Sequence, residues 1–145
     1  MIENFRLKDL REDNFWTQEQ VAQKLKIVRR TYAEYELKNN MIPINLLYDL
    51  AVLYQVSIQY LCGLTNYKDP YGEFMPYDKS KFLSNLKNLR EQHGYTQAEL
   101  GQKLSCGQDT ISLYESGSRN IPIDILILLS KLYKIPIDYL LDVVK

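Results

Sequence analysis

Residues 17–25 read TQEQVAQKL and residues 96–104 read TQAELGQKL, and these two stretches decide the fold. In each, a Thr stands before an apolar helical pattern and a Gln or Glu follows three residues later, which is the capping box that begins a helix. An apolar residue before the cap and another inside the helix add a hydrophobic staple, as Trp16 and Val21 do in the first copy. The same helix start is therefore written twice in one chain.

The duplication extends well beyond these nine residues. Residues 7–66 align with residues 86–145 at a constant offset of 79, without a gap and with about 23 identities in about 60 positions. A unit of this length is too long for a solenoid repeat. We therefore expect two small domains, at residues 1–66 and 81–145, joined by a linker at residues 67–80.

Each copy reads as a series of short helices. The first carries Leu and Arg at amphipathic spacing, the second starts at the capping Thr, and the third follows a break of three or four residues. Two short helices joined by a tight turn form a helix-turn-helix pattern. A fourth helix opens at a Pro, and a short fifth helix turns two apolar residues inward. The third helices are RRTYAEYE (29–36) and QDTISLYE (108–115), and the fourth open at Pro43 and Pro122.

Composition is that of a globular protein, with 46% hydrophobic and 25% charged residues. The most apolar run, residues 121–141, is interrupted by four charged residues, and the start of the chain has no apolar targeting segment. Cys62, Cys106 and the lone His93 support neither a disulfide framework nor a zinc site nor a nucleophile and base pair. We expect a soluble, cytoplasmic protein that is not an enzyme, with packed thiols and without a metal, a cofactor or a membrane partner.

The second copy, LREQHGYTQAELGQKLSCGQDTISLYESGSRNIPIDILILLSKLYKIPIDYLL (89–141), resembles the Cro and phage-repressor type of helix-turn-helix domain, the XRE family of bacterial regulators. The resemblance rests on the Thr-Gln that opens the second helix, the Thr-Ile-Ser in the third, the Tyr-Glu-x-Gly at its end and the closing IPIDYLL. The first copy matches over the same length. The resemblance implies an all-α chain of two tandem five-helix lambda-repressor-like DNA-binding domains joined by a short linker, from a bacterium or a phage.

The first copy departs from this pattern at a few positions. It has no Gly in the turn, Tyr32 stands where Ile111 stands in the second copy, and Leu-Lys-Asn replaces the Ser-Gly-Ser around Gly117. Asn39 or Asn40 is expected to adopt the left-handed conformation that Gly117 supplies in the second copy.

Groove geometry explains why such a unit binds double-stranded DNA. A helix fits the major groove, and the N-terminal NH groups of the preceding helix meet a phosphate. The resemblance implies a DNA-binding site made of the Thr-Gln pairs, the outward residues of the third helices and flanking cations. Its residues are Thr17, Gln18, Lys26, Arg29, Arg30, Ala33, Glu34 and Lys38 in the first copy, and Thr96, Gln97, Gln108, Asp109, Ser112 and Arg119 in the second. The alternative is that the Thr residues are only caps and the Gln residues only surface.

The two third helices differ in their chemistry. Arg pairs with guanine, Gln with adenine, and a carboxylate accepts a hydrogen bond from cytosine, so the two copies would read different sequences. By contrast, the Tyr-Glu pair at the end of each third helix reads as structural. Tyr35 and Tyr114 are expected to face the core, and Glu36 and Glu115 to brace the loop that follows.

Charge favours the first copy as the DNA-binding one. The chain has 18 basic and 18 acidic residues, whereas DNA-binding domains are usually basic. However, four cations fall within the seven residues 24–30, and the second copy has only Lys103 near its turn before Asp109. The second copy is expected to add weak contacts or dimerisation through its apolar end YLLDVV (139–144). The aromatic residues of the linker are expected to pack it against one of the domains.

The sequence therefore predicts a DNA-binding transcriptional regulator, of repressor type, with double-stranded DNA as its partner. A competing interpretation is a protein-interaction module, such as an antirepressor or an antitoxin, that kept the fold and lost DNA binding. A homodimer and an unidentified protein partner stay open.

Overall fold

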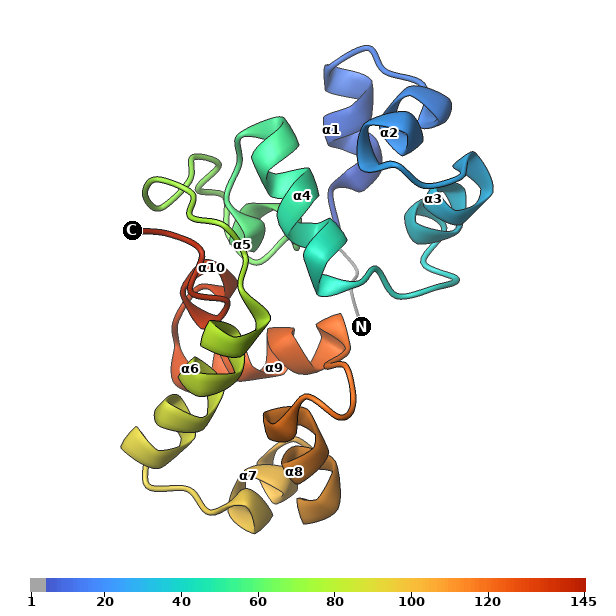
Figure 1. The fold of residues 1–145 in the computed structure, drawn as a ribbon. Coiled ribbons are helices and arrows are strands. Elements are labelled where there is room, and N and C mark those ends of the chain that lie inside the picture. The colour runs from blue at the N-terminus through green and yellow to red at the C-terminus, as the bar shows by residue number, and fades with distance from the viewer. Residues whose placement is uncertain (1–4) are drawn as a thin grey trace. The chain divides into compact units, whose positions relative to one another are not determined.

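The computed structural model describes residues 5–145, and its architecture is all-α (Figure 1). Within these residues ten helices form two groups of five, with a single isolated β-bridge between Phe74 and Val144 and no regular strand. The first unit ends at Tyr71 and the second spans Gly72–Lys145, so the boundary falls among the residues expected to form the linker. Residues 1–4 of the expected first domain lie outside the described residues. The predicted fold class is confirmed.

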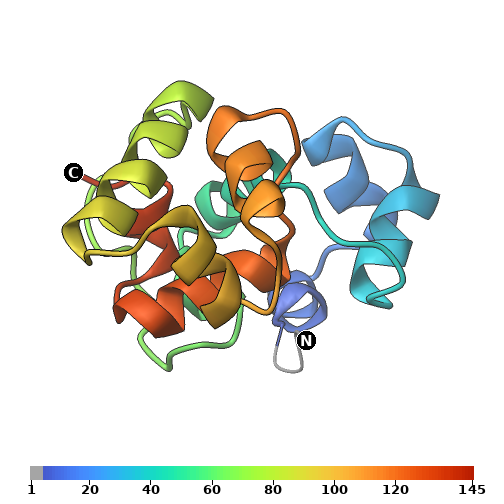
Figure 2. The same cartoon turned by 90° about the horizontal axis from the view of Figure 1, so that it is seen from below.

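The five helices of each unit follow the same order. In the first unit they are α1 (Leu7–Asp13), α2 (Gln18–Leu25), α3 (Arg29–Glu36), α4 (Ile44–Tyr54) and α5 (Ile58–Leu61). In the second unit they are α6 (Lys79–Gln92), α7 (Gln97–Lys103), α8 (Gln108–Ser116), α9 (Ile123–Tyr133) and α10 (Ile137–Leu140). Figure 2 shows the same helices from below.

Both predicted capping boxes are present. The Thr17 hydroxyl accepts from the backbone N–H of Gln20 at 3.1 Å, and the Gln20 side chain accepts from the backbone N–H of Thr17 at 2.8 Å. Thr96 and Glu99 repeat the arrangement at 3.1 and 2.9 Å. Each box satisfies two of the N–H groups that a helix leaves unpaired at its start, which fixes where α2 and α7 begin.

The left-handed residue that follows α3 is not one of the two that the sequence predicted. The left-handed conformation expected of Asn39 or Asn40 belongs to Lys38, whose φ is 62° and which aligns with Gly117 at φ 80°. The Asn39 side chain instead donates to Glu34 at 2.9 Å. The chain has to turn directly after the C-cap residue of α3, so position in the turn outweighs the preference of Asn for this conformation.

Each unit has its own apolar core. In the first unit the core includes Tyr32 and the buried residues of α4 and α5, most of them without exposed surface. In the second unit it includes the buried residues of α9 and α10. The expectation that residues 139–144 form a dimer surface is wrong for most of that segment. Leu140, Leu141 and Val143 have no exposed surface, and Tyr139 is the exposed apolar residue there.

The connector is held at both ends. The backbone carbonyl oxygen of Lys68 accepts from the N–H of Ser57 at 2.9 Å within the first unit. In the second unit, the N–H of Met75 donates to the carbonyl of Val143 at 2.7 Å, and the N–H of Lys145 donates to that of Glu73 at 3.0 Å. The segment is therefore not a free tether over its whole length.

Two further features of the described residues bear on function. Among residues 5–145, no helix has the length and the apolar character needed to cross a membrane. Over the same residues, no group of three or more His, Cys, Asp and Glu side chains is placed to hold a metal ion.

The loop before α2 provides a test of backbone strain. Phe15 has φ 57° and is 93% exposed, whereas Gly94 has φ 74° at the aligned position, with no atom within 4 Å of where a Cβ would lie. We expect Phe15→Gly to stabilise the first unit and Gly94→Ala to destabilise the second, each by about 1 kcal/mol, because an L side chain is strained in this conformation. Urea denaturation of the full chain, followed by circular dichroism, measures both. Opposite signs would contradict the argument.

Candidate nucleic-acid interface

The first unit places α2 and α3 side by side with a three-residue turn between them (Figure 1). Lys26 closes α2 in the left-handed conformation, and Val28 is the extended N-cap residue of α3. The chain therefore reverses direction sharply between the two helices, which leaves the first turn of α3 exposed.

A buried ion pair holds α3 in place. The guanidinium of Arg11 in α1 donates to the Glu36 carboxylate through Nε at 2.7 Å and through Nη2 at 3.1 Å. Its Nη1 donates to the backbone carbonyl of Trp16 at 3.0 Å, and the Gln18 side-chain amide donates to the same carboxylate at 3.1 Å. Three segments, α1, the start of α2 and the end of α3, thus meet at one carboxylate.

The electrostatics of this cluster favour the charged forms of both partners. Burial pushes the pKa of Glu36 upward, but the hydrogen bonds from Arg11 and Gln18, together with the nearby Tyr32 hydroxyl, outweigh burial and hold that pKa below its ordinary value. The hydrogen bond with Glu36 raises the pKa of Arg11. With side chains only 12% and 5% exposed, the pair is shielded from solvent and salt.

The second unit repeats the cluster almost atom for atom. Arg90 donates to Glu115 through Nε at 2.6 Å and Nη2 at 3.1 Å and to the carbonyl of Tyr95 at 2.8 Å, while Gln97 donates to Glu115 at 3.1 Å. The interpretation of Glu36 and Glu115 as braces for the following loop is therefore wrong, because the first helix of each unit supplies their main partner. Tyr35 and Tyr114 are buried, as expected.

The predicted site residues of the first unit fall into two groups. Thr17 and Gln18 lie at the start of α2, and the Gln18 amide keeps one N–H and its oxygen available beyond the bond to Glu36. Arg29 and Arg30 are the exposed first two residues of α3, and neither forms an ion pair with any described residue. Lys26, in the turn before them, is also exposed.

The remaining predicted residues of the first unit lie farther along α3. Ala33 and Glu34 are half-buried on its outer turns, and Lys38 is exposed just after its end. Sequence reasoning missed Val28, which is 67% exposed beside the two arginines. Its signal was an apolar residue directly before the first arginine, where the second copy has Gly107.

The second unit presents the same positions with different chemistry. Its outward residues are spread over the start of α7, the first two turns of α8 and the loop after α8. Thr96 caps α7, Gln97 is tied to Glu115, Gln108, Asp109 and Ser112 are exposed on α8, and Arg119 is exposed beyond it. The first turn of α8 therefore carries an acid where α3 carries an arginine.

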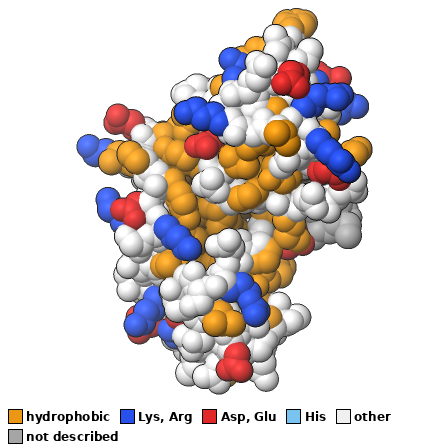
Figure 3. Space-filling model, turned by 45° about the vertical axis from the view of Figure 1, so that its right-hand side comes forward, with side chains coloured by type: hydrophobic (Ala, Val, Ile, Leu, Met, Phe, Trp, Pro, Cys, Tyr) orange, Lys and Arg blue, Asp and Glu red, His pale blue; other side chains and the backbone are white. Residues whose placement is uncertain are grey.

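Charge over the surface is mixed. Lys and Arg side chains are spread over the face shown in Figure 3, with Asp and Glu among them. This distribution agrees with the zero net charge of the chain. A local concentration of cations, as at Lys26, Arg29 and Arg30, therefore matters more than the overall charge.

Family comparison agrees with this geometry in both halves of the chain. A family model described as "Helix-turn-helix domain" matches residues 4–66, and one described as "Helix-turn-helix" matches residues 86–140. The chain is a tandem pair of helix-turn-helix domains. The predicted resemblance to the XRE type is confirmed. The match in the first unit covers α1–α5, and the match in the second covers the latter part of α6 and α7–α10.

Relatives of the helix-turn-helix domains come from Bacillus subtilis (strain 168). The HTH-type transcriptional regulator YobD is 42% identical over 68 residues, which cover 47% of this chain and 61% of that protein. The HTH-type transcriptional regulator ImmR is 45% identical over 56 residues, which cover 39% of this chain and 44% of that protein. The chain thus matches less than two thirds of the length of either relative.

A solved structure, that of a transcriptional regulator from Listeria innocua, is also similar. It has 30% sequence identity and a TM-score of 0.42, over 44% of this chain and 60% of that one.

The ion pair of the first helix-turn-helix domain predicts how stability depends on pH. Because the pKa of Glu36 is lowered by folding, its contribution is complete above its ordinary pKa of 4.5 and is lost as the pH falls through the folded value. We expect Glu36→Gln to destabilise the first domain by about 3–5 kcal/mol at pH 7 and to flatten the loss of stability below about pH 5. Urea denaturation followed by the fluorescence of Trp16, the single Trp of the chain, reports on this domain. An equal acid dependence in both proteins would contradict the assignment.

Proposed function

We propose that the chain is a DNA-binding transcriptional regulator, of repressor type, in which the first helix-turn-helix domain makes the stronger contact with double-stranded DNA. The observation that carries this proposal is the pair Arg29 and Arg30. Both are exposed at the start of α3 and without an ion-pair partner among the described residues, next to the exposed Lys26. Arginines in this position suit bidentate hydrogen bonds to guanine and charge neutralisation of phosphates.

The rest of the first domain supports this arrangement. Gln18 is held by Glu36 with one N–H to spare, so it reaches a phosphate at little cost in side-chain entropy. Glu34, held by Asn39, keeps acceptor capacity for the amino group of cytosine. The exposed apolar surface of Val28 suits contact with the methyl group of thymine. The relatives YobD and ImmR are both named as HTH-type transcriptional regulators.

The second domain offers weaker electrostatic attraction. Asp109 in the first turn of α8 repels phosphate, while Gln108 suits adenine and Arg119 lies beyond the helix. We therefore assign to the second domain weak contacts with DNA, or contacts that adjust the preference for a DNA sequence. A homodimer would need a surface other than the buried residues of segment 139–144.

A protein-interaction module that kept the fold and lost DNA binding is the second candidate. The zero net charge of the chain favours it. A gel shift of the full chain against random and genomic DNA fragments, at low and moderate salt, separates the two functions. Salt-sensitive binding supports the regulator, and no binding at low salt supports the interaction module.

Replacing the arginines tests the readout. We expect Arg29→Ala or Arg30→Ala to cost about 1–3 kcal/mol of DNA-binding free energy and to relax preference at one base pair. Lys26→Ala, a phosphate contact in this scheme, should weaken binding to all sequences alike and reduce the log–log salt slope by about 1. Selection from a random DNA pool and salt titrations measure both. Unchanged binding by the double arginine variant would remove α3 from the interface.

The difference between the two domains can be tested by gain of function. Gln108→Arg combined with Asp109→Arg gives α8 the first two residues of α3. Both positions are exposed, so the fold should be retained, and we expect tighter binding with a salt slope steeper by about 0.9 for each new phosphate contact. Gln108→Ala is the neutral control. An unchanged slope would mean that the second domain does not meet DNA.

A further inference from the structure

An open groove lies on the surface of the first helix-turn-helix domain, beside the first two turns of α2. It has a volume of about 340 Å³ and is lined by one aromatic and three polar residues, Trp16, Gln20, Gln23 and Lys24. The three polar residues are exposed, and Trp16 is half-buried. No acidic residue is among those that line the groove, so the only charge there is the ammonium of Lys24.

The aromatic wall of the groove is held in place by its neighbours. The backbone N–H of Trp16 donates to the carbonyl of Arg11 at 3.1 Å, and the Trp16 carbonyl accepts from the Arg11 guanidinium at 3.0 Å. The indole ring lies 5.7 Å from the ring of Tyr54, and the Lys24 ammonium lies over the indole, 4.7 Å from its centroid. The ring attracts a cation in this position, which orders the lysine without neutralising its charge.

The two glutamines add hydrogen-bond donors to this cation. The Gln20 side-chain oxygen accepts from the backbone N–H of Thr17 at 2.8 Å, and the two N–H groups of the same amide have no partner among residues 5–145. Gln23 forms no side-chain hydrogen bond within that range, and Lys24 forms no ion pair there. The groove therefore presents an ammonium and four amide N–H groups, a set that suits an anion.

The second domain differs at this place by one charge. The aligned residues are Tyr95, Glu99, Gln102 and Lys103. The Lys103 ammonium again lies over the aromatic ring, at 5.3 Å from the centroid of Tyr95. Glu99, however, stands where the first domain has Gln20, and hydrogen bonds with Thr96 hold the pKa of its carboxyl below the ordinary value. An ionised carboxylate thus offsets the lysine in the second domain and would repel an anion.

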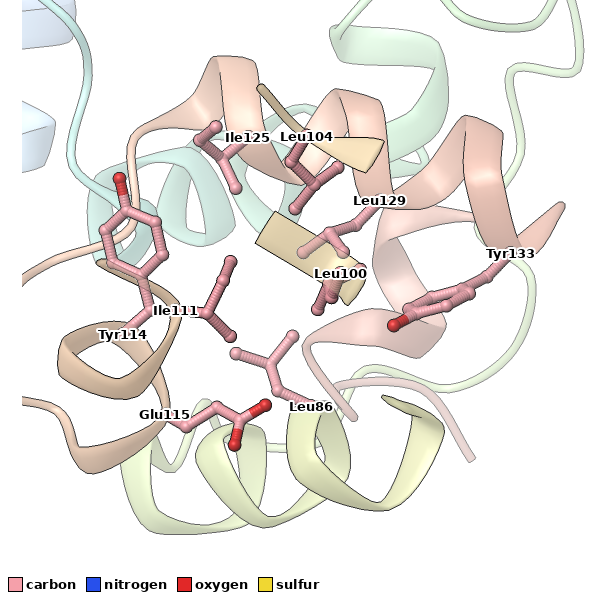
Figure 4. Close-up of a pocket in the computed structure, with 9 residues that line it drawn as sticks. All are labelled: Leu86, Leu100, Leu104, Ile111, Tyr114, Glu115, Ile125, Leu129 and Tyr133. Atoms are coloured by element: carbon pink, nitrogen blue, oxygen red, sulfur yellow. The ribbon is translucent and has the colours of Figure 1, made fainter. Parts of the chain in front are cut away.

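The core of the second domain offers no other site for an anion. Figure 4 shows a small hollow there, lined almost wholly by apolar side chains such as Leu86, Leu100 and Ile111. A charged group placed among them would lose its hydration without gaining partners. The contrast between the two domains therefore lies at the surface, where only the first domain combines the lysine with neutral neighbours.

We propose that the groove of the first domain binds a backbone phosphate of double-stranded DNA, next to the phosphate met by the start of α2. This inference rests on the proposed function. The groove begins at Trp16, directly before Thr17 and Gln18, and each strand of B-DNA carries a phosphate about every 3.4 Å along the axis. A strand that meets Gln18 therefore brings a neighbouring phosphate close to the flank of α2. An open, polar groove suits one group of a long polymer, whereas sites for small ligands enclose them and are mostly apolar.

Changing the charge of the groove tests the proposal. Gln20→Glu gives the first domain the residue of the second, and the capping box should persist because Glu99 completes the one at α7. Lys24→Gln removes the cation. We expect each variant to weaken binding of the full chain to all DNA sequences alike and to reduce the log–log salt slope by about 0.9, the loss of one phosphate contact. Lys8→Gln, which removes an exposed lysine of α1, is the matched control and should leave the slope unchanged.

The outcomes separate the groove from the proposed function. An unmodified chain that does not bind DNA at low salt would overturn both. Binding by the unmodified chain that neither Gln20→Glu nor Lys24→Gln weakens would overturn the role of the groove alone. The same holds if Lys8→Gln reduces the slope as much as Lys24→Gln does, because the effect would then reflect overall charge.

Uncharged phosphates locate the contact on the DNA. In a duplex selected from the random pool, each phosphate is replaced in turn by a methylphosphonate, and the unmodified chain is compared with Lys24→Gln. One replacement should weaken binding of the unmodified chain and have no further effect on Lys24→Gln, because both changes remove the same contact. Effects that add at every phosphate would overturn the proposal. Circular dichroism checks that each variant retains the fold.

Discussion

The buried ion pair between the first and third helices is the interaction on which each helix-turn-helix domain depends. In the first domain the Arg11 guanidinium contacts the carboxylate of Glu36 and the carbonyl of Trp16, and Gln18 joins the same carboxylate. Such a pair adds little net stability, because removing two charges from water offsets most of their attraction. Its effect is geometric. A bidentate guanidinium accepts few orientations of its partner, so the end of α3 is fixed against α1 and the start of α2.

This constraint explains which residues are the same in the two domains and which differ. The residues of the cluster, Arg, Glu and Gln, are identical in the two copies, and their distances agree within 0.2 Å. The exposed residues at the start of the third helix share nothing, since Arg29 and Arg30 face Gln108 and Asp109 in the alignment. The exposed residues at the start of the third helix can therefore change without any change in how that helix is held.

Sequence reasoning recovered the helices because their starts are marked locally. Capping boxes and N-terminal prolines determine local hydrogen bonds and φ angles, so Thr17, Thr96, Pro43 and Pro122 placed the helices to within a residue. The ion pair was not recovered because it joins residues 25 apart, and a Glu at a helix end suits a loop contact as well. The identity of Arg11 and Arg90 alongside that of the two glutamates was the signal that could have found it.

The left-handed residues show where local preference gave way to the fold. Lys38 adopts this conformation although two asparagines follow it, and Phe15 does so in an exposed loop where the second domain has Gly94. In both cases the strained residue lies just after a helix that carries one member of the ion pair: Phe15 follows α1, which carries Arg11, and Lys38 follows α3, which carries Glu36. Glu36 precedes Lys38 by two residues, and Trp16, whose carbonyl binds Arg11, follows Phe15 directly. The groups held by the ion-pair cluster set the path of the backbone at both turns. Phe15 and Lys38 adopt the left-handed conformation that this path requires, at a cost of about 1–2 kcal/mol each.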